Sequence, residues 1–407
     1  MSPHRLLTPE TSPEPELPQC KGTWQATTQK RKRSWPAAGS QKPSQSGTIQ
    51  AQWENEWRSA CQKSLHPFQD GRYEGFEPIF KDLLDGHIDD PKSPEYTLAF
   101  FPKAQELASK ADDALQRGDR ALATEFYLRA CAVLRIARYP STQENPCPVK
   151  QRAWKLQKSL YLKAGRLWEN PLDEVIIPHI HDPKTNPHQH VHESGGVKHR
   201  GERTATVHRP HIPACVRLPT DTLCTGRTCP AVLIVSDDRT AHTRQCEEAL
   251  SRGWGCVVVE APGAGDCPVS EAEGEEAADA LWSSVLDWMA AIRVFDMGMV
   301  VAWGLGEAVV RMAGTHGDRL KGCVARLGSA GGKDLPMPEE LSCRLLLVTD
   351  GDSAVESCRP RTPVVEGEGP DEGGLALFAY GVPGTSVVQH PMADTRTVYK
   401  WVEAIVG

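Results

Sequence analysis

The residues that bear most directly on chemistry lie in the stretch 299–315, MVVAWGLGEAVVRMAGT. Residues 300–302 predict a buried strand, and residues 308–313 predict the start of a helix. A Gly-x-Ser-x-Gly turn between such a strand and such a helix lifts a serine hydroxyl above the sheet for attack on a carbonyl carbon. Here the five turn positions, 304–308, are Gly-Leu-Gly-Glu-Ala, with Gly306 at the centre. The sequence therefore predicts the turn of a serine nucleophile without the serine.

Two neighbouring side chains are candidates for a substitute role. Glu307 adjoins Gly306 and is either an acid or base at the site or a solvated turn glutamate. Cys267 follows the run 255–260 and would be a replacement nucleophile. A nearby negative charge such as Asp266 raises a thiol pKa, so we expect Cys267 to be part of the loop architecture instead.

A histidine-rich stretch is the remaining candidate for chemistry. Eight histidines fall between His179 and His211, including the alternating run at 188–192, HQHVH. Alternating histidines on an extended segment can face one metal ion. The stretch is also rich in Pro and Gly, with no acidic or cysteine ligands at useful spacing. We therefore expect an exposed, adventitious metal binder, and neither a structural metal nor a cofactor.

The elements that must position these residues follow from hydrophobic periodicity. Helices are predicted at 103–117 and 122–138, as an antiparallel pair, and then at 150–168. Short aliphatic runs further along predict strands, and two amphipathic stretches predict helices. The strands are 174–178, 216–218, 231–235, 255–260, 300–303, 322–325 and 345–348, and the helices are 280–292 and 396–406. This alternation predicts an α/β fold with a mostly parallel sheet and helices on both of its faces.

Composition bounds the organisation of the 407 residues and the class of partner. Residues 1–50 are rich in Pro, Ser, Thr and Gln and are expected to be a disordered tail. A helical domain at 51–172 and an α/β core at 173–407 follow, with the histidine-rich insertion at 182–210. A net charge of −7 argues against nucleic acid, and the absence of a long apolar run argues against a membrane. A cytoplasmic protein is expected.

Five segments match one known pattern in order along the chain. They are Trp53–Phe80, Phe126–Pro140, Leu167–His181, Arg252–Pro268 and Leu281–Trp288. With them the chain resembles the fungal secondary-metabolite α/β-hydrolases, a family that includes the polyketide-shortening hydrolase of conidial pigment and melanin synthesis. The fusarin- and cytochalasan-cluster hydrolases are similar to it as well. The resemblance covers about residues 51–407 and implies an α/β-hydrolase core capped by an amino-terminal helical domain.

The resemblance also implies a Ser-Asp-His triad in that chain order. Carried over by position, the serine falls on Gly306, the acid on Asp352 in TDGDS, and the base on His390 in VVQHPM. Three departures accompany the missing serine. The Gly-rich loop expected to supply an oxyanion amide is replaced by residues 236–239, Ser-Asp-Asp-Arg, and the closing Gly of the turn is Ala308. Between Ala325 and Cys343 the sequence leaves room for only a short loop, where the family carries a long helical lid segment.

For function, the resemblance implies hydrolysis of an ester, thioester or carbon–carbon bond in a polyketide intermediate. Without the serine, base-assisted cyclisation or dehydration through His390 and Asp352 is one alternative. A catalytically inactive relative that binds an intermediate or a partner enzyme is another. The expected partner is a small polyketide-derived molecule, with a polyketide synthase as a second candidate. The oligomeric state is open, a homodimer being one option.

Overall fold

The computed structural model describes most of the helical part and the sheet of the protein. The described residues are 48–140, 147–185, 210–327 and 341–349, the strands 376–380 and 385–389, and the helix 395–406. The predicted tail lies outside them up to residue 47, and so does the histidine-rich insertion from 186 to 209.

The amino-terminal part is helical, and the expected antiparallel pair and third helix are confirmed. Its elements are α1 (Ile49–Gln52), the π-helical turn η1 (Trp53–Trp57), α2 (Arg58–Gln62), α3 (Tyr73–Asp85), α4 (Pro94–Gln116), α5 (Arg120–Ala137) and α6 (Pro148–Gly165). Helix α4 begins nine residues before the predicted start and contains Pro102 in its interior. Pro94 occupies its first turn, where a missing N–H costs nothing, and the Ser93 hydroxyl accepts a hydrogen bond from the Tyr96 N–H at 3.2 Å.

A nine-stranded sheet forms the rest of the described chain, in the order β1-β2-β4-β3-β5-β6-β7-β9-β8. The strands are β1 (Asp173–Pro178), β2 (His211–Arg217), β3 (Cys229–Ser236), β4 (Gly255–Glu260), β5 (Phe295–Leu305), β6 (Gly322–Leu327), β7 (Arg344–Thr349), β8 (Ala376–Tyr380) and β9 (Thr385–Gln389). Strands β4, β3, β5, β6, β7 and β9 run parallel, whereas β1–β2, β2–β4 and β8–β9 are antiparallel pairs. A parallel sheet in this order with an antiparallel second strand is the α/β-hydrolase fold, as expected.

Helices cover both faces of the sheet. They are α7 (Thr220–Thr225), α8 (Thr243–Leu250), α9 (Glu275–Ile292), α10 (Gly306–Thr315) and α12 (Thr395–Val406), with short 3₁₀ turns η2 (Pro183–Thr185), η4 (Glu271–Glu273) and η5 (Gly317–Arg319). Alternate residues of β3 belong to two different hydrophobic clusters. Val232 and Ile234 pack in the cluster that holds residues of α8, α12 and the helical domain. Leu233 and Val235 pack in the cluster that holds residues of α9 and α10. Period-two alternation thus gives the sheet two buried faces.

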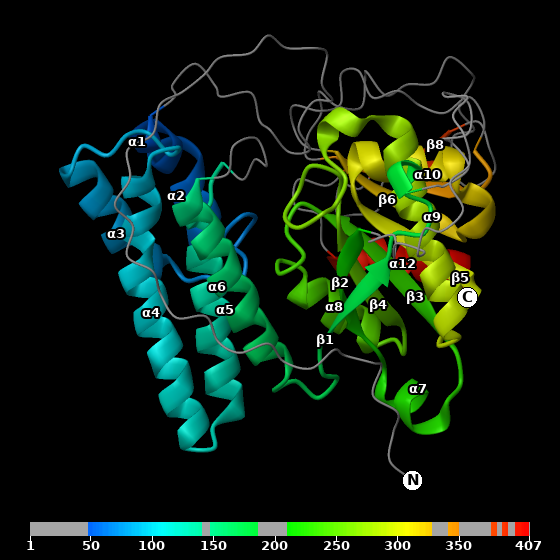
Figure 1. The fold of residues 1–407 in the computed structure, drawn as a ribbon, viewed down its shortest axis with the longest axis horizontal. Coiled ribbons are helices and arrows are strands. Elements are labelled where there is room, and N and C mark those ends of the chain that lie inside the picture. Colours follow the sequence, from blue (N-terminus) through cyan, green and yellow to red (C-terminus); the bar gives the residue numbers. More distant parts are fainter. Residues whose placement is uncertain are drawn as a thin grey trace, which may run out of the picture.

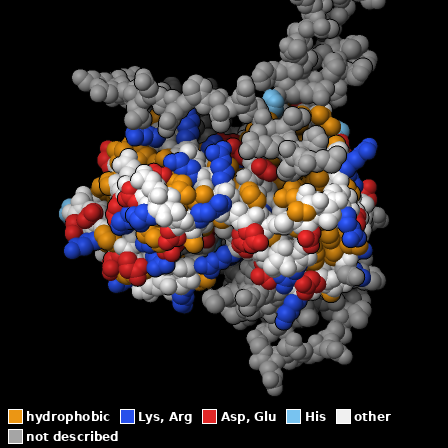
Figure 2. All heavy atoms as spheres, turned by 90° about the horizontal axis from the view of Figure 1, so that it is seen from below, with side chains coloured by type: hydrophobic (Ala, Val, Ile, Leu, Met, Phe, Trp, Pro, Cys, Tyr) orange, Lys and Arg blue, Asp and Glu red, His pale blue; other side chains and the backbone are white. Residues whose placement is uncertain are grey.

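The helical part and the sheet stand side by side, α3–α6 on one side and the strands on the other (Figure 1). Seen from below they form two lobes, each with basic and acidic side chains intermixed over the visible surface (Figure 2). Within the described residues, no helix combines the length and the apolar character needed to cross a bilayer.

Candidate functional site

The strand–helix junction lies where the sequence predicts it, but it is tighter than expected. Gly304 and Leu305 belong to β5 and not to a separate turn, and Gly306 is the first residue of α10. Gly304 pairs with Val235 of β3, and a Cβ at this position would lie 1.8 Å from the Val235 carbonyl oxygen. The close approach of two backbones therefore explains this glycine, and Gly306 follows at the carboxyl edge of the sheet.

The expected acid and base, Asp352 and His390, lie outside the described residues. The strands that precede them are described. Strands β7 and β9 are parallel neighbours, and their last residues, Thr349 and Gln389, are register partners. The described ends of these two strands are therefore neighbours, and the roles of Asp352 and His390 stay predictions.

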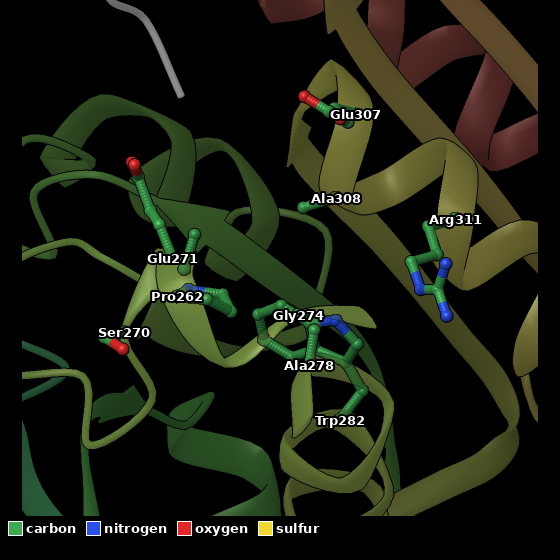
Figure 3. Close-up of a pocket in the computed structure, with 10 residues that line it drawn as sticks. Pro262, Ser270, Glu271, Gly274, Ala278, Trp282, Glu307, Ala308 and Arg311 are labelled. Carbon is green, nitrogen blue, oxygen red and sulfur yellow. The ribbon is translucent and has the colours of Figure 1, made fainter. Parts of the chain in front are cut away.

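Glu307 lines a small pocket between α10 and the segment that follows β4. The pocket is about 50 Å³, and its lining is Ala261, Pro262, Ser270, Glu271, Gly274, Ala278, Trp282, Glu307, Ala308 and Arg311. In Figure 3, Glu307 and Ala308 approach from α10, and Glu271 and Pro262 lie on the opposite side. Burial, followed by the Glu271 and Glu275 carboxylates, raises the pKa of Glu307. Arg311 is held by Asp279 at 2.6 Å and by Glu275.

In the loop after β3, Asp238 is paired with two arginines of the helical domain. Asp238 is buried, and its Oδ2 lies 3.4 Å from Arg135 Nε and 3.3 Å from Arg138 Nη1, both on or next to α5. Gln157 of α6 donates to the same oxygen at 2.8 Å. Burial opposes the charge of Asp238, but the two guanidinium groups outweigh it and hold the pKa of this carboxyl below its usual range. Asp238 thus joins the sheet to the helical domain, and it is already neutralised.

A second buried network surrounds Arg239. Its guanidinium lies 2.7 Å from Glu260, 2.9 Å from Asp266 and 2.9 Å from Glu174. Cys267, beside Asp266, is buried, and burial raises the pKa of its thiol to about 12, with Glu260 and Glu273 adding to the effect. Burial rather than Asp266 is the main cause of this shift, because Asp266 faces Arg239 at 2.9 Å and the Lys158 ammonium at 2.5 Å. The packing of Cys267 agrees with the expected role in the loop architecture.

Sequence reasoning missed a group of residues that the fold gathers at the end of β3. His242 Nε2 lies 2.5 Å from Ser236 Oγ, and His242 Nδ1 contacts the Gln245 side chain. The Ser236 hydroxyl also donates to the Asp238 carbonyl at 3.1 Å and accepts from the Asp238 N–H at 3.0 Å. Because Ser236 is buried and its hydroxyl is used within the turn, the Ser–His pair orders the loop and does not replace the missing nucleophile.

His66 of the helical domain is the second missed residue. The residue is exposed, and its ring Nδ1 lies 3.5 Å from Gln69 Nε2. Desolvation lowers the pKa of His66, Asp237 raises it, and Arg326, Arg135 and His242 lower it further. A histidine between Leu65 and Pro67 carries no periodic signal, and nothing in the sequence relates it to residues some 170 positions further on.

The described residues contain no group of three or more His, Cys, Asp or Glu side chains that could hold a metal ion. The alternating histidines at 188–192 lie outside them, so the expectation for that stretch is unchanged.

No protein-family model matches the chain, and no curated protein matches it. Among solved structures, the 2,6-dihydroxy-pseudo-oxynicotine hydrolase is 15% identical, with a TM-score of 0.45 over 68% of this chain and 80% of its own. The structure named AbyA5 wildtype is 15% identical, with a TM-score of 0.43 over 74% of this chain and 83% of its own. The glucuronoyl esterase from Solibacter usitatus is 13% identical, with a TM-score of 0.34 over 49% and 78%. Since these TM-scores are below 0.5, the α/β-hydrolase fold follows from the strand order and the strand–helix junction of the chain itself.

Proposed function

We propose that this α/β-hydrolase-fold protein acts on a polyketide-derived carbonyl compound by acid–base chemistry, without a covalent acyl-enzyme. The observation that carries the proposal is Gly306 at the first position of α10, directly after β5. The fold presents its nucleophile at this position, and glycine has no side-chain atom that can attack. Cyclisation and dehydration need only proton transfers, so they do not depend on that atom.

His390 and Asp352 are the residues we assign to the proton transfer. Histidine titrates near neutrality, and an aspartate partner fixes its tautomer and stabilises its protonated form. The register pairing of Thr349 with Gln389 supports the assignment, because the two residues follow these neighbouring strand ends in the chain. The polyketide class of substrate comes from the family resemblance.

The absence of an acyl-enzyme is tested by a fluorophosphonate probe and an activated ester. We expect no stoichiometric labelling of any serine and no burst of alcohol release, because a triad without its nucleophile loses about 10⁶-fold in turnover. Mass spectrometry of the labelled protein is the measurement. A labelled serine, Ser236 included, would refute this part of the proposal.

The base chemistry is tested by two variants in a pathway extract. His390→Ala should lower product formation by about 10²-fold or more, whereas Gly306→Ala should leave it nearly unchanged. In a serine hydrolase, by contrast, product formation would require both the histidine and the residue at the nucleophile position. Wild-type behaviour of both variants would instead identify a protein that only binds an intermediate or a partner enzyme.

Deleting the gene and profiling metabolites tests the pathway assignment. An unchanged polyketide profile would contradict that assignment.

A further inference from the structure

The pocket lined by Glu307 lies directly beside the position of the absent nucleophile. Gly306 begins α10, and the next two residues, Glu307 and Ala308, form part of the pocket wall. Pro262, the second residue after β4, lies on the opposite side (Figure 3). Ligands of open α/β sheets bind outside the carboxyl ends of the strands. The pocket is therefore placed where this fold holds a reacting group.

The walls of the pocket are mostly apolar, and the space between them is small. Five apolar side chains line it, which are Ala261, Pro262, Ala278, Trp282 and Ala308. Because a volume of about 10–15 Å³ holds one water molecule, the pocket of about 50 Å³ accepts only a few non-hydrogen atoms. A hydroxyl-bearing carbon with its methyl substituents is a group of this size, whereas a whole polyketide is not.

Glu307 is the acidic side chain of the pocket that is left without a partner. Arg311, which also lines the pocket, donates to the two carboxylate oxygens of Asp279 at 2.9 Å and 2.6 Å, and its remaining nitrogen contacts Glu275. Glu307 is half-buried and has neither a hydrogen-bond nor an ion-pair partner within the described part of the chain. Its carboxyl group is therefore free to interact with a molecule in the pocket.

The surroundings of Glu307 favour its protonated form. Burial, followed by the carboxylates of Glu271 on η4 and Glu275 on α9, raises the pKa of Glu307. The first turn of α10 acts in the opposite direction, because the amino terminus of a helix stabilises a negative charge. The same helix end therefore stabilises the carboxylate once its proton has left. A carboxyl group in such surroundings is suited to donate a proton.

We infer that Glu307 is the catalytic acid for the dehydration of a β-hydroxycarbonyl compound, whose hydroxyl-bearing carbon occupies the pocket. The inference rests on the proposed function and deepens it in two respects. It assigns the proton donor that acts together with the base His390. It also narrows the substrate to a carbonyl compound with a hydroxyl group on its β-carbon.

The step balances without a co-reactant. The base removes a proton from the α-carbon, and the C–H electron pair forms the C=C bond between the α- and β-carbons. The bond from the β-carbon to the hydroxyl oxygen breaks, its electron pair stays on the oxygen, and this oxygen takes the proton of Glu307 and leaves as water. The products are an α,β-unsaturated carbonyl compound and water. The protonated base then returns a proton to the Glu307 carboxylate through solvent, which restores both groups.

Dehydration of diacetone alcohol to mesityl oxide by the full chain tests the inference. Diacetone alcohol carries its hydroxyl on a carbon with two methyl groups, and the conjugated product is followed by its ultraviolet absorbance. The wild type should form mesityl oxide faster than denatured protein at the same concentration. Glu307→Gln should slow the reaction by about 10²-fold, which is the lower end of a general-acid contribution. Glu276→Gln, at an exposed position of α9, is the matched control and should keep the wild-type rate.

A pH profile separates proton donation from a structural role. Because a proton donor acts in its protonated form, the rate should fall as the pH rises through the pKa of Glu307, and this fall should lie above pH 4.5, the usual value of glutamate. Glu271→Gln removes a carboxylate that raises this pKa, so it should move the fall to lower pH. Glu307→Asp keeps the acid and should retain part of the rate, whereas Glu307→Gln should abolish the fall. Circular dichroism checks that the variants are folded.

The outcomes distinguish the inference from the proposed function. A folded Glu307→Gln protein that dehydrates diacetone alcohol at the wild-type rate would overturn the role of Glu307 and leave the acid–base proposal standing. A wild type no faster than its denatured control would overturn the substrate class, while His390→Ala in the pathway extract still decides the proposed function. If Glu307→Gln slows the dehydration and His390→Ala does not, the inference stands and the base of the proposed function is wrong.

Discussion

At Gly304 the backbones of β5 and β3 approach so closely that a side chain has no room. We expect Gly304→Ala to destabilise the protein by more than about 3 kcal/mol, because a Cβ 1.8 Å from the Val235 oxygen forces the strands apart. Urea unfolding followed by circular dichroism measures this. The control is Gly253→Ala: Gly253 has a φ of 76° and no atom within 4 Å of the added Cβ, so only backbone strain of about 1–2 kcal/mol is expected. Equal effects of the two substitutions would contradict the account of Gly304.

Single residues also show which features of the site the sequence alone cannot predict. Gly306 could be assessed from its neighbours in the chain, since a strand, a turn and a helix are local features. For Cys267 the neighbouring Asp266 gave the right direction of the pKa shift but the wrong cause, because the shift comes mainly from burial in the folded chain. Asp238 could not be assessed in this way, because Arg138, one of its two charge partners, is 100 positions away. An isolated pair of aspartates predicts a negative loop, whereas the folded chain neutralises Asp238 and leaves only Asp237 half-buried at the edge.

Among the elements, helix α5 connects the helical domain to the end of β3, because Arg135 links the turn that contains His66 to the loop after this strand. Arg135→Met should destabilise the protein by about 3–5 kcal/mol, since it leaves Asp238 short of a partner and two turn carbonyls without a donor. The exposed Arg72, paired with Glu125 at 2.7 Å, provides the control. Arg72→Met should cost less than about 1 kcal/mol in the same urea unfolding experiment. A small effect at Arg135 would mean that the turn is held by other contacts.

The elements were predictable to the extent that their patterns are local. The strand predicted from the aliphatic run 255–260 has the same bounds as β4, and the helix predicted at 280–292 covers most of α9. Strand β2 begins five residues before the predicted 216, because its first half, HIPAC, alternates weakly and contains Pro213. Strands β8 and β9 were not predicted, since each has five residues and depends on a partner strand for its hydrogen bonds.

At the scale of the whole molecule, the helical domain and the sheet share one core. A single buried cluster runs from Trp53 and Phe100 in the helices to Trp303 of β5 and Tyr399 of α12. The end of β3 therefore meets the helical domain across a packed and charged interface. The sequence does not reveal this, because the residues that meet are separated by whole elements.

The pH dependence of stability tests the charged part of that interface. A carboxyl whose pKa is depressed on folding stabilises the protein fully above its unfolded pKa, and this stabilisation is lost as the pH falls towards the folded pKa. The pKa of Asp238 is lowered from 3.8, so its contribution should be complete at pH 6 and should decline through pH 3. The stability advantage of the wild type over Asp238→Asn should therefore shrink by about 1 kcal/mol between pH 6 and pH 3, measured by urea unfolding. Asp113→Asn, at an exposed site on α4, should stay within about 0.5 kcal/mol of the wild type at both pH values. An advantage that is constant or grows as the pH falls would show that Asp238 is not held ionised by Arg135 and Arg138.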